Sequence, residues 1–180
     1  MSGPGTTREI SLPATALAHL RRAFEKEAGA LATVHVCHDA GFATGAQVFE
    51  QLAPYLGPDP SGSPESAFWS ELDRFFSLRG WGSLTHERIH PGLSVLRSSD
   101  WGESDESSDD RQQPGCAFTS GVLAHVLGRV ANGPVAVLEA ACRSRGDPKC
   151  SFVFGSEGAI HDLYGFLLDG DTLETALSRM

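Results

Sequence analysis

The chain has 180 residues, of which 41% are hydrophobic and 21% charged, and this suits one ordinary core burying roughly 70% of the unfolded surface. Its 23 acidic and 14 basic residues give a formal net charge of −9, which disfavours the phosphate-neutralising surface that direct nucleic-acid binding requires. No apolar run reaches the ~18 residues that a membrane span needs, so we expect a single cytoplasmic domain over residues 1–180, with neither nucleic acid nor membrane as a direct partner.

The first half of the chain is predicted to be helical. Apolar residues at helical spacing predict one helix over residues 13–29 and a second over 42–52, which Pro54 should end. Gly, Pro and Ser are frequent in residues 56–63, which indicates a connection. A third helix should then run over residues 64–80, with a serine cap before it and a glycine at its end.

The middle of the chain changes to a period of two. Residues 81–88 and 93–97 alternate around the turn Pro91–Gly92, which predicts a β-hairpin. Residues 98–113 are rich in acidic and small polar side chains, so we expect a solvated loop there. Trp101 is the one large aromatic residue of this segment.

The final third is predicted to contain a fourth helix, a second hairpin and two further helices. These elements cover, in order, residues 116–132, the strands 135–138 and 151–154, residues 160–170, and a short helix that Asp171 and Glu174 open as a capping box. Helices and antiparallel hairpins in separate runs indicate an α+β domain, with a β-sheet packed against helices and a core over residues 13–168.

Three cysteines and one glutamate follow the pattern C-x(22)-E-x(2)-C-x(7)-C as Cys116, Glu139, Cys142 and Cys150. Cys116 stands at a predicted helix start, where backbone amides stabilise a thiolate. Cys142 and Cys150 flank a Gly-Asp-Pro turn, so a hairpin can bring their sulfurs together. Zinc accepts four such ligands tetrahedrally. Two other interpretations stay open at this point: the cysteines are small buried hydrophobes, or Cys142 and Cys150 pair across the hairpin under oxidation.

A shared metal ion places a demand on the strand that carries Glu139. On a regular strand, Glu139 and Cys142 point to opposite faces, so the chain must bulge or bend near Ala140 if both bind one ion. Three thiolates and a carboxylate also exceed the charge of a dication. Three basic residues of the same hairpin could offset that excess, namely Arg143, Arg145 and Lys149.

Residues 114–155, PGCAFTSGVLAHVLGRVANGPVAVLEAACRSRGDPKCSFVFG, resemble the 4-vinyl reductase domain family, which occurs alone and as the sensor of phenol- and xylene-responsive transcription regulators. Residues 41–52, GFATGAQVFEQL, are more weakly similar to a glycine-bearing helix of that family. The resemblance implies a mixed fold shared with Golgi transport-particle subunits and frequent homodimerisation. It also implies a zinc site at Cys116, Glu139, Cys142 and Cys150. Because protein side chains then fill all four positions, we expect this zinc to be structural.

Residues 86–90, His-Glu-Arg-Ile-His, match the H-E-x-x-H pattern of zinc proteases, which requires a helix to turn both histidines the same way. Pro91 and Gly92 follow directly and disfavour a helix. We therefore predict a strand here and keep a metalloprotease only as a remote alternative.

A ligand cavity would be lined by aromatic side chains, and the candidates are Trp101, Phe76, Trp81, Phe118 and Trp69. At helical spacing such residues are more commonly core. In the phenol-sensing relatives, a tryptophan after the second hairpin strand helps to bind the ligand, and residues 96–104 are similar to that region. Those relatives also use a histidine four residues before a glycine. Phe76 stands at that position here, so we expect a ligand more apolar than phenol, or none.

The leading hypothesis is a non-enzymatic, zinc-stabilised sensor domain that binds a small hydrophobic or aromatic molecule and acts through a regulatory protein partner, as a homodimer. The chain has neither a P-loop nor a dinucleotide-binding fingerprint. Two alternatives remain: an accessory protein in tetrapyrrole vinyl reduction, of the bacteriochlorophyll type, and an assembly subunit without a ligand.

Overall fold

The computed structural model describes residues 9–56, 65–104 and 115–180. Its elements, in chain order, are α1 (Thr15–Ala28), α2 (Ala30–Leu56), α3 (Glu65–Leu78), β1 (Thr85–His90), β2 (Leu93–Ser98), α4 (Ala117–Ala131), β3 (Ala136–Ala141), the 3-10 turn η2 (Arg143–Arg145), β4 (Cys150–Gly155), α5 (Glu157–Leu168) and α6 (Leu173–Arg179). The four strands form one antiparallel sheet in the order β1-β2-β4-β3. The predicted α+β class is therefore confirmed.

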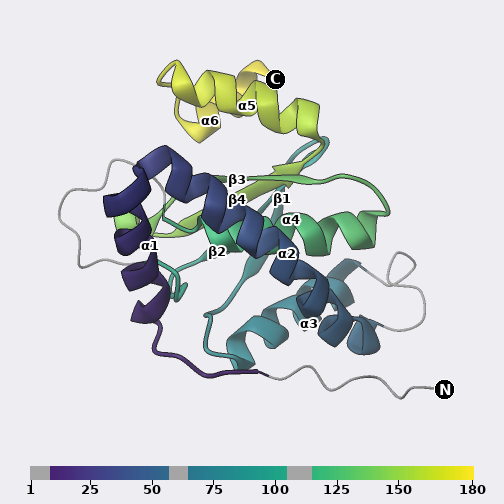
Figure 1. The fold of residues 1–180 in the computed structure, drawn as a ribbon. Coiled ribbons are helices and arrows are strands. Elements are labelled where there is room, and N and C mark those ends of the chain that lie inside the picture. The colour runs from purple at the N-terminus through teal and green to yellow at the C-terminus, as the bar shows by residue number, and fades with distance from the viewer. Residues whose placement is uncertain (1–8, 57–64, 105–114) are drawn as a thin grey trace.

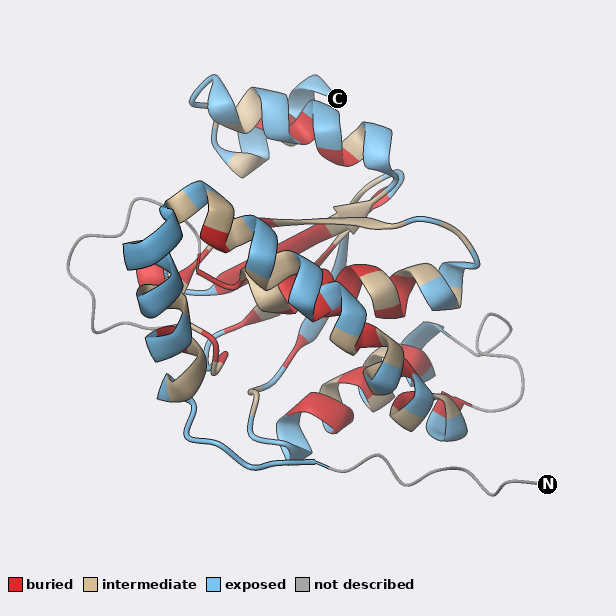
Figure 2. Cartoon of the chain, in the orientation of Figure 1, coloured by how far each residue is buried: buried red, intermediate tan, exposed pale blue. Residues whose placement is uncertain are grey.

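The sheet lies between two layers of helices (Figure 1). Alternate residues of its strands face opposite layers, as the strand period requires. Leu96 and Phe152 belong to the larger core with α2, α3 and α4. Leu93, Val95 and Val153 belong to a smaller core with α5 and α6. In Figure 2 the buried residues accordingly concentrate where α4 and the sheet face other elements.

Helices α2 and α4 pack closely because glycines occupy their contact. A Cβ atom added to Gly45 would lie 2.5 Å from the His125 Cβ atom, and one added to Gly41 or Gly121 would collide with the backbone of the opposite helix. These glycines allow the two helices to lie closer together than any larger residue would permit. The close approach holds the start of α4, where Cys116 stands, against α2.

The second helix differs most from its prediction. It begins at Ala30, directly after Gly29, and continues through Pro54 to Leu56. Proline removes one helical hydrogen bond, but Leu52 and Leu56 are buried on either side of it, and their burial offsets that cost. The predicted connection over 56–63 and the serine cap before the third helix lie outside the described residues, except for Leu56.

Smaller corrections concern three segment ends. The first strand starts at Thr85 rather than at residue 81, because Gly80 and Gly82 adopt positive φ angles of 77° and 114° that a strand does not accommodate. The third strand extends to Ala141. Helix α6 is capped by Thr172, whose hydroxyl accepts the Thr175 N–H at 3.2 Å, and not by Asp171.

The segment after β2 is not the solvated loop that its acidity predicts. Trp101 is 1% exposed and Glu103 is 5% exposed, so residues 101–104 pack into the molecule, while Ser99 and Asp100 stay exposed. The rest of the predicted loop falls outside the described residues.

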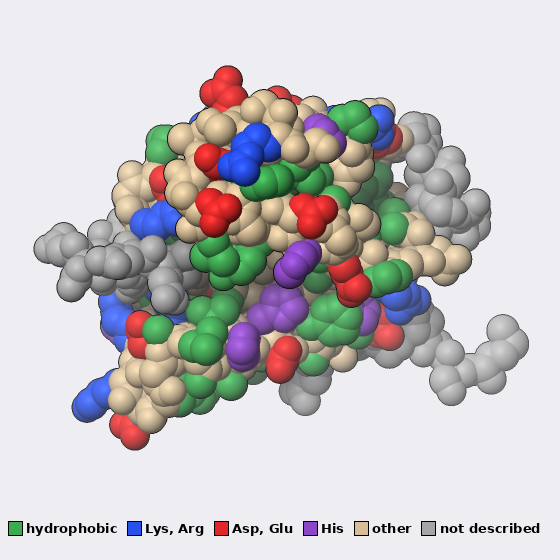
Figure 3. All heavy atoms as spheres, turned by 90° about the horizontal axis from the view of Figure 1, so that it is seen from above, with side chains coloured by type: hydrophobic (Ala, Val, Ile, Leu, Met, Phe, Trp, Pro, Cys, Tyr) green, Lys and Arg blue, Asp and Glu red, His purple; other side chains and the backbone are tan. Residues whose placement is uncertain are grey.

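Charged side chains are interspersed on the face seen in Figure 3, where acidic and basic groups alternate with hydrophobic ones. That face shows no gathering of basic residues, in keeping with the net negative charge. Of the helices that the structure describes, none is long and apolar enough to cross a membrane.

Candidate metal centre and adjacent cavities

Three thiols and one carboxylate converge at the edge of the larger core. The ligand atoms of Cys116, Glu139, Cys142 and Cys150 all lie within 4.8 Å of one another, and all four residues are buried. The Cys116 sulfur lies 3.9 Å from that of Cys142 and 4.0 Å from that of Cys150. The structure thus brings the four predicted residues together, and the described cysteines form no disulfide.

The predicted irregularity of the strand is present. In the pairing of β3 with β4, Glu139 faces Phe152 but Ala141 faces Ser151, so Ala140 is the extra residue of a bulge. The bulge reverses the parity of the strand after Glu139. It therefore allows Glu139 and Cys142 to point to the same side of the sheet.

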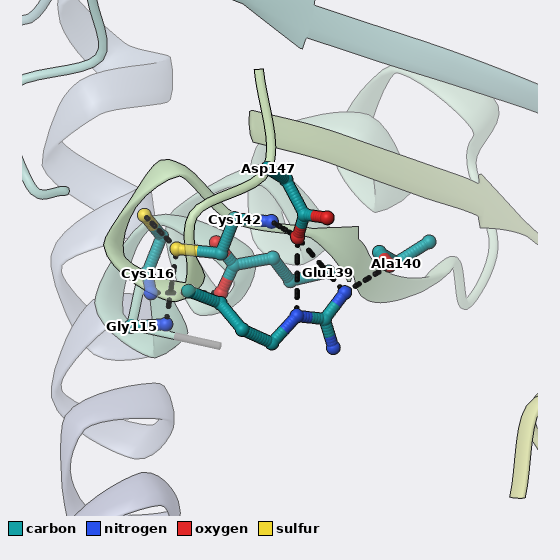
Figure 4. A network of polar contacts seen from close by, with 7 residues as sticks. Gly115, Cys116, Glu139, Ala140, Cys142 and Asp147 are labelled. Carbon is teal, nitrogen blue, oxygen red and sulfur yellow. Dashed lines mark hydrogen bonds and ion pairs between the residues drawn. The ribbon is translucent and has the colours of Figure 1, made fainter. Parts of the chain in front are cut away.

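Backbone donors orient the cluster (Figure 4). The Gly115 N–H donates to the Cys142 sulfur at 3.3 Å, and the Cys116 N–H donates to Glu139 Oε2 at 2.8 Å. The other carboxylate oxygen of Glu139, Oε1, is buried and has no hydrogen-bond partner in the described part of the chain. An unpartnered buried oxygen beside three sulfurs is suited to a cation.

Asp147 and Arg145 brace the turn behind Cys142. The Asp147 carboxylate accepts the Cys142 N–H at 2.8 Å and pairs with the Arg145 guanidinium at 2.9 Å. Arg145 also donates to the Ala140 carbonyl at 3.1 Å, at the bulge. Asp147 thus balances the charge of Arg145. Arg145 contributes to the cluster mainly by positioning the turn.

Whether the thiols and the carboxyl of this cluster carry protons depends on whether a cation is bound. Hydrogen bonding with Cys142 and Cys150, together with burial, raises the pKa of Cys116, and burial raises the pKa of Glu139. Hydrogen bonds from the other two thiols lower the pKa of Cys150 to about 4. Without a cation, the protein environment therefore favours a thiolate at Cys150 and keeps protons on Cys116 and Glu139. A dication would replace those protons.

Glu103 is a buried polar residue that sequence reasoning missed. Its carboxylate accepts the Phe118 N–H at 3.0 Å and the Thr119 N–H at 2.8 Å, at the N-terminus of α4. Thr119 Oγ1 also donates to it and accepts the indole N–H of Trp101 at 2.8 Å. Glu103 therefore caps the helix that begins at Cys116 and links that helix to Trp101. No motif marks an acid in this role within an acidic segment.

The buried position of Glu103 predicts a pH dependence of stability. Desolvation by burial raises its pKa from 4.5 to about 7, so the folded state binds a proton that the unfolded state releases. Its stabilising contribution is complete below pH ~4.5 and is lost as the pH rises through about 7. Between these limits we expect the free energy of unfolding of wild type to fall by on the order of 3 kcal/mol. The Glu103→Gln protein should lack this fall.

Urea denaturation at several pH values measures that slope. Glu174→Gln, which changes an exposed glutamate of α6, is the matched control and should keep the wild-type pH profile. If the Glu103→Gln protein shows the same decline as wild type, the carboxyl of Glu103 is not its source.

Four of the five predicted ligand-binding aromatics form one cluster, and the fifth does not join it. The Trp101 ring contacts those of Phe76 and Trp81 at centroid distances of 5.4 and 5.9 Å. Trp81 stacks on Phe118 at 6.0 Å. Trp69 instead stacks on His86 at 3.9 Å.

A cavity of about 660 Å³ adjoins this cluster, between α2, α3 and α4. Phe76, Trp81 and Phe118 line it, while Trp101 lies behind Phe76 and Trp81. Residues Glu9–Ser11 pass along its rim. The Arg79 guanidinium fastens that rim by donating to Glu9 at 2.9 Å and to Gln51 at 3.0 Å.

The His-Glu-Arg-Ile-His segment lies on strand β1, as predicted, and not on a helix. Glu87 pairs with Arg97, and His86 stacks on Trp69. Among the described residues, only one group of three or more potential metal ligands converges. It consists of Cys116, Glu139, Cys142 and Cys150, the Cys3Glu cluster. The helical geometry that protease chemistry requires is thus absent from this segment.

Comparison with known proteins supports the predicted resemblance. Residues 103–156 match the model of the 4-vinyl reductase domain family, and this range contains all four cluster residues. Among solved structures, the phenol-responsive sensory domain of the transcription activator PoxR with phenol is similar, with a TM-score of 0.71 and 18% identity over 84% of this chain and 78% of that one.

A vinyl-4-reductase family protein from Methanocaldococcus jannaschii has a TM-score of 0.48 and 22% identity, over 84% of both chains. No curated protein matches the chain. The comparisons thus establish a match to the 4-vinyl reductase domain over residues 103–156 and a fold like that of the PoxR sensory domain.

Proposed function

We propose that this chain is a zinc-stabilised sensor domain that binds a small hydrophobic or aromatic molecule and transmits its occupancy to a protein partner. The observation that carries the proposal is the cavity between α2, α3 and α4, which four aromatic side chains line. One of these, Phe118, stands two residues after Cys116 at the start of α4. The fold likeness to the phenol-responsive domain of PoxR supports the same conclusion.

Zinc is the cation that suits the Cys3Glu cluster best, because it binds thiolate sulfur and carboxylate oxygen and favours four-coordinate tetrahedral sites, although glutamate is a less usual ligand there than histidine. When bound, the ion would supply a cross-link and a positive charge. The residues of this chain would then hold the N-terminus of α4 to the hairpin of β3 and β4. Because four protein ligands fill the coordination sphere, the site is structural rather than catalytic.

The aromatic part of the cavity wall favours an apolar ligand over phenol. Its volume of about 660 Å³ lies within the range of roughly 300–1,000 Å³ that is typical of small-molecule sites. The indole N–H of Trp101 is already donated to Thr119, and Phe76 offers no hydrogen bond. A ligand hydroxyl would therefore lose its water without gaining a partner from these two residues.

The proposal also includes a cytoplasmic location and a homodimer. Free thiols at 4 Å spacing persist best in a reducing compartment. Large apolar side chains are exposed on the neighbouring helices α1 and α2, which suits a contact between two copies. These side chains are Leu20, Phe24, Leu31, Val36 and Phe42.

Thermal unfolding with p-xylene, naphthalene and phenol tests the sensor function. Saturation at about 100 times Kd should stabilise the protein by about 2.7 kcal/mol, which corresponds to a rise in Tm of about 5 °C or more. We expect p-xylene and naphthalene to produce a larger rise than phenol, because the phenyl rings of Phe76 and Phe118 on the cavity wall offer a ligand hydroxyl no hydrogen bond.

Val48→Phe should reduce this rise, because Val48 lines the cavity and a phenyl ring would occupy part of it. Val36→Phe is the matched control, since Val36 lies on the same helix outside this cavity, and it should respond like wild type. Stabilisation by a tetrapyrrole alone would favour the accessory role in vinyl reduction. A lack of stabilisation by every compound would contradict the sensor proposal and favour an assembly subunit.

A further inference from the structure

The segment before α1, residues 9–12, runs along the rim of the cavity between α2, α3 and α4, and we call it the strap. Residues 9–11 line that cavity together with its four aromatic side chains. In Figure 1 the strap passes from the start of α1 along the end of α3. All of its residues are exposed, and Ile10 and Leu12 are 83% and 63% exposed. Apolar burial therefore does little to hold the strap in place.

One ion pair joins the strap to the rest of the molecule. Arg79 Nε donates to the Glu9 carboxylate at 2.9 Å, and residues 9–12 make no other hydrogen bond or ion pair with the part of the chain that the structure describes. Arg79 itself is fixed by α2 and α3. Its guanidinium lies 3.7 Å from the centroid of the Phe75 ring, its Nη1 donates to the Phe75 carbonyl oxygen at 3.2 Å, and its Nη2 donates to Gln51 at 3.0 Å. The strap is thus attached at one point, which the two helices hold in position.

The ion pair is exposed and therefore weak. The side chain of Glu9 is 53% exposed and that of Arg79 is 31% exposed. An exposed pair of this kind favours its closed state over the open one by a factor of only about 1.4 to 5, and salt screens it further. Such a contact breaks and re-forms readily. It suits a movable cover of the cavity better than a permanent wall.

We propose that the strap gates this cavity. A ligand enters and leaves while the Glu9–Arg79 pair is broken, and the strap closes over the ligand when the pair re-forms. The inference rests on the proposed function, because it concerns how a ligand of the same cavity is exchanged. The pair forms whether the cavity is empty or occupied, so it alters the rates of binding and release more than the dissociation constant.

Stopped-flow measurement of naphthalene binding, followed by tryptophan fluorescence, tests the gate. We expect the Glu9→Gln protein to bind and release naphthalene about two- to fivefold faster than wild type, with a Kd that changes by less than about twofold. High salt should accelerate exchange in wild type, because it screens the pair, but not in the Glu9→Gln protein. Glu27→Gln, the same chemical change at an exposed position of α1, is the matched control and should keep the wild-type rates. Equal rates for wild type and the Glu9→Gln protein would overturn the gate.

Acrylamide quenching of Trp81 tests the strap without any ligand. Trp81 lines the cavity and Trp101 is 1% exposed, so Trp69→Phe, introduced into both proteins, leaves Trp81 as the main accessible tryptophan. Opening of the strap by Glu9→Gln should then increase the quenching constant. If naphthalene does not bind but the quenching increases, the strap is a gate and the sensor function is contradicted. Unchanged quenching would overturn the gate and leave the sensor function standing wherever naphthalene binds.

Discussion

Cys142→Ser is expected to abolish zinc binding and to lower the Tm by about 10 °C or more. Cys142 is central to the cluster, since its sulfur lies 3.9 Å from that of Cys116 and accepts the Gly115 N–H. Losing the ion would leave Glu139 and two thiols buried without a positive charge. Loss of a structural metal belongs to the mechanisms that cost more than ~4 kcal/mol, and each kcal/mol shifts the Tm by about 2–4 °C at this chain length.

Native mass spectrometry and differential scanning calorimetry measure the two effects. We expect one zinc ion per wild-type chain and none per Cys142→Ser chain. Cys37→Ser is the matched control, because Cys37 is the described cysteine outside the cluster, and it should retain both zinc and most of the wild-type Tm. A strong chelator should bring wild type close to the Tm of the Cys142→Ser protein. Wild-type protein that is folded, metal-free and unaffected by the chelator would contradict the zinc site.

Gly121→Ala is the second substitution with a large expected effect. Gly121 lies in the contact of α4 with α2, where an added Cβ atom would collide with the His38 carbonyl oxygen and the Phe42 backbone nitrogen. Backbone atoms cannot rotate away as a side chain can, so α2 itself would have to move. The collision should outweigh the ~1 kcal/mol gain in helix propensity, and we expect a net loss of at least ~2 kcal/mol in the free energy of unfolding.

Gly165→Ala provides the matched control within another helix. Gly165 lies in α5, is exposed, and has no atom within 4 Å of the position that a Cβ atom would take. The same chemical change should therefore stabilise the protein, by ~0.5–1 kcal/mol. Urea denaturation of both variants measures the difference. Two shifts of the same sign would show that the α2–α4 contact is less tight than the structure indicates.

The convergence of Cys116, Glu139, Cys142 and Cys150 was predictable from residue types, spacing and the family resemblance. Residue types and spacing identified all four members, and strand parity predicted the bulge near Ala140 that the pairing of β3 with β4 contains. Cys116 was also correctly placed at a helix start. The H-E-x-x-H match was correctly assigned to a strand, since Pro91 and Gly92 act on the residues next to them. The bulge, the helix start and the strand depend on interactions within a few residues, whereas the cluster joins residues up to 34 positions apart.

The aromatic candidates were predictable only as a set. Their residue types indicated burial, but nothing in the pattern separated Trp69, which stacks on His86, from the four that cluster near the cavity. The length of α2 was underestimated for a similar reason. Pro54 is a helix breaker by local rules, and only the burial of Leu52 and Leu56 against other elements offsets it.

The sequence by itself determined the α+β class and the hairpins, because period and turn residues act over short distances along the chain. Residue types and spacing also marked the four residues that converge in the Cys3Glu cluster. The tertiary structure decided which acid of a polar segment becomes the buried cap of α4, which glycines admit a neighbouring helix, and where a cavity remains between α2, α3 and α4. Those features arise where residues far apart in the chain share one space, and the free energy of burial depends on every surface that meets there.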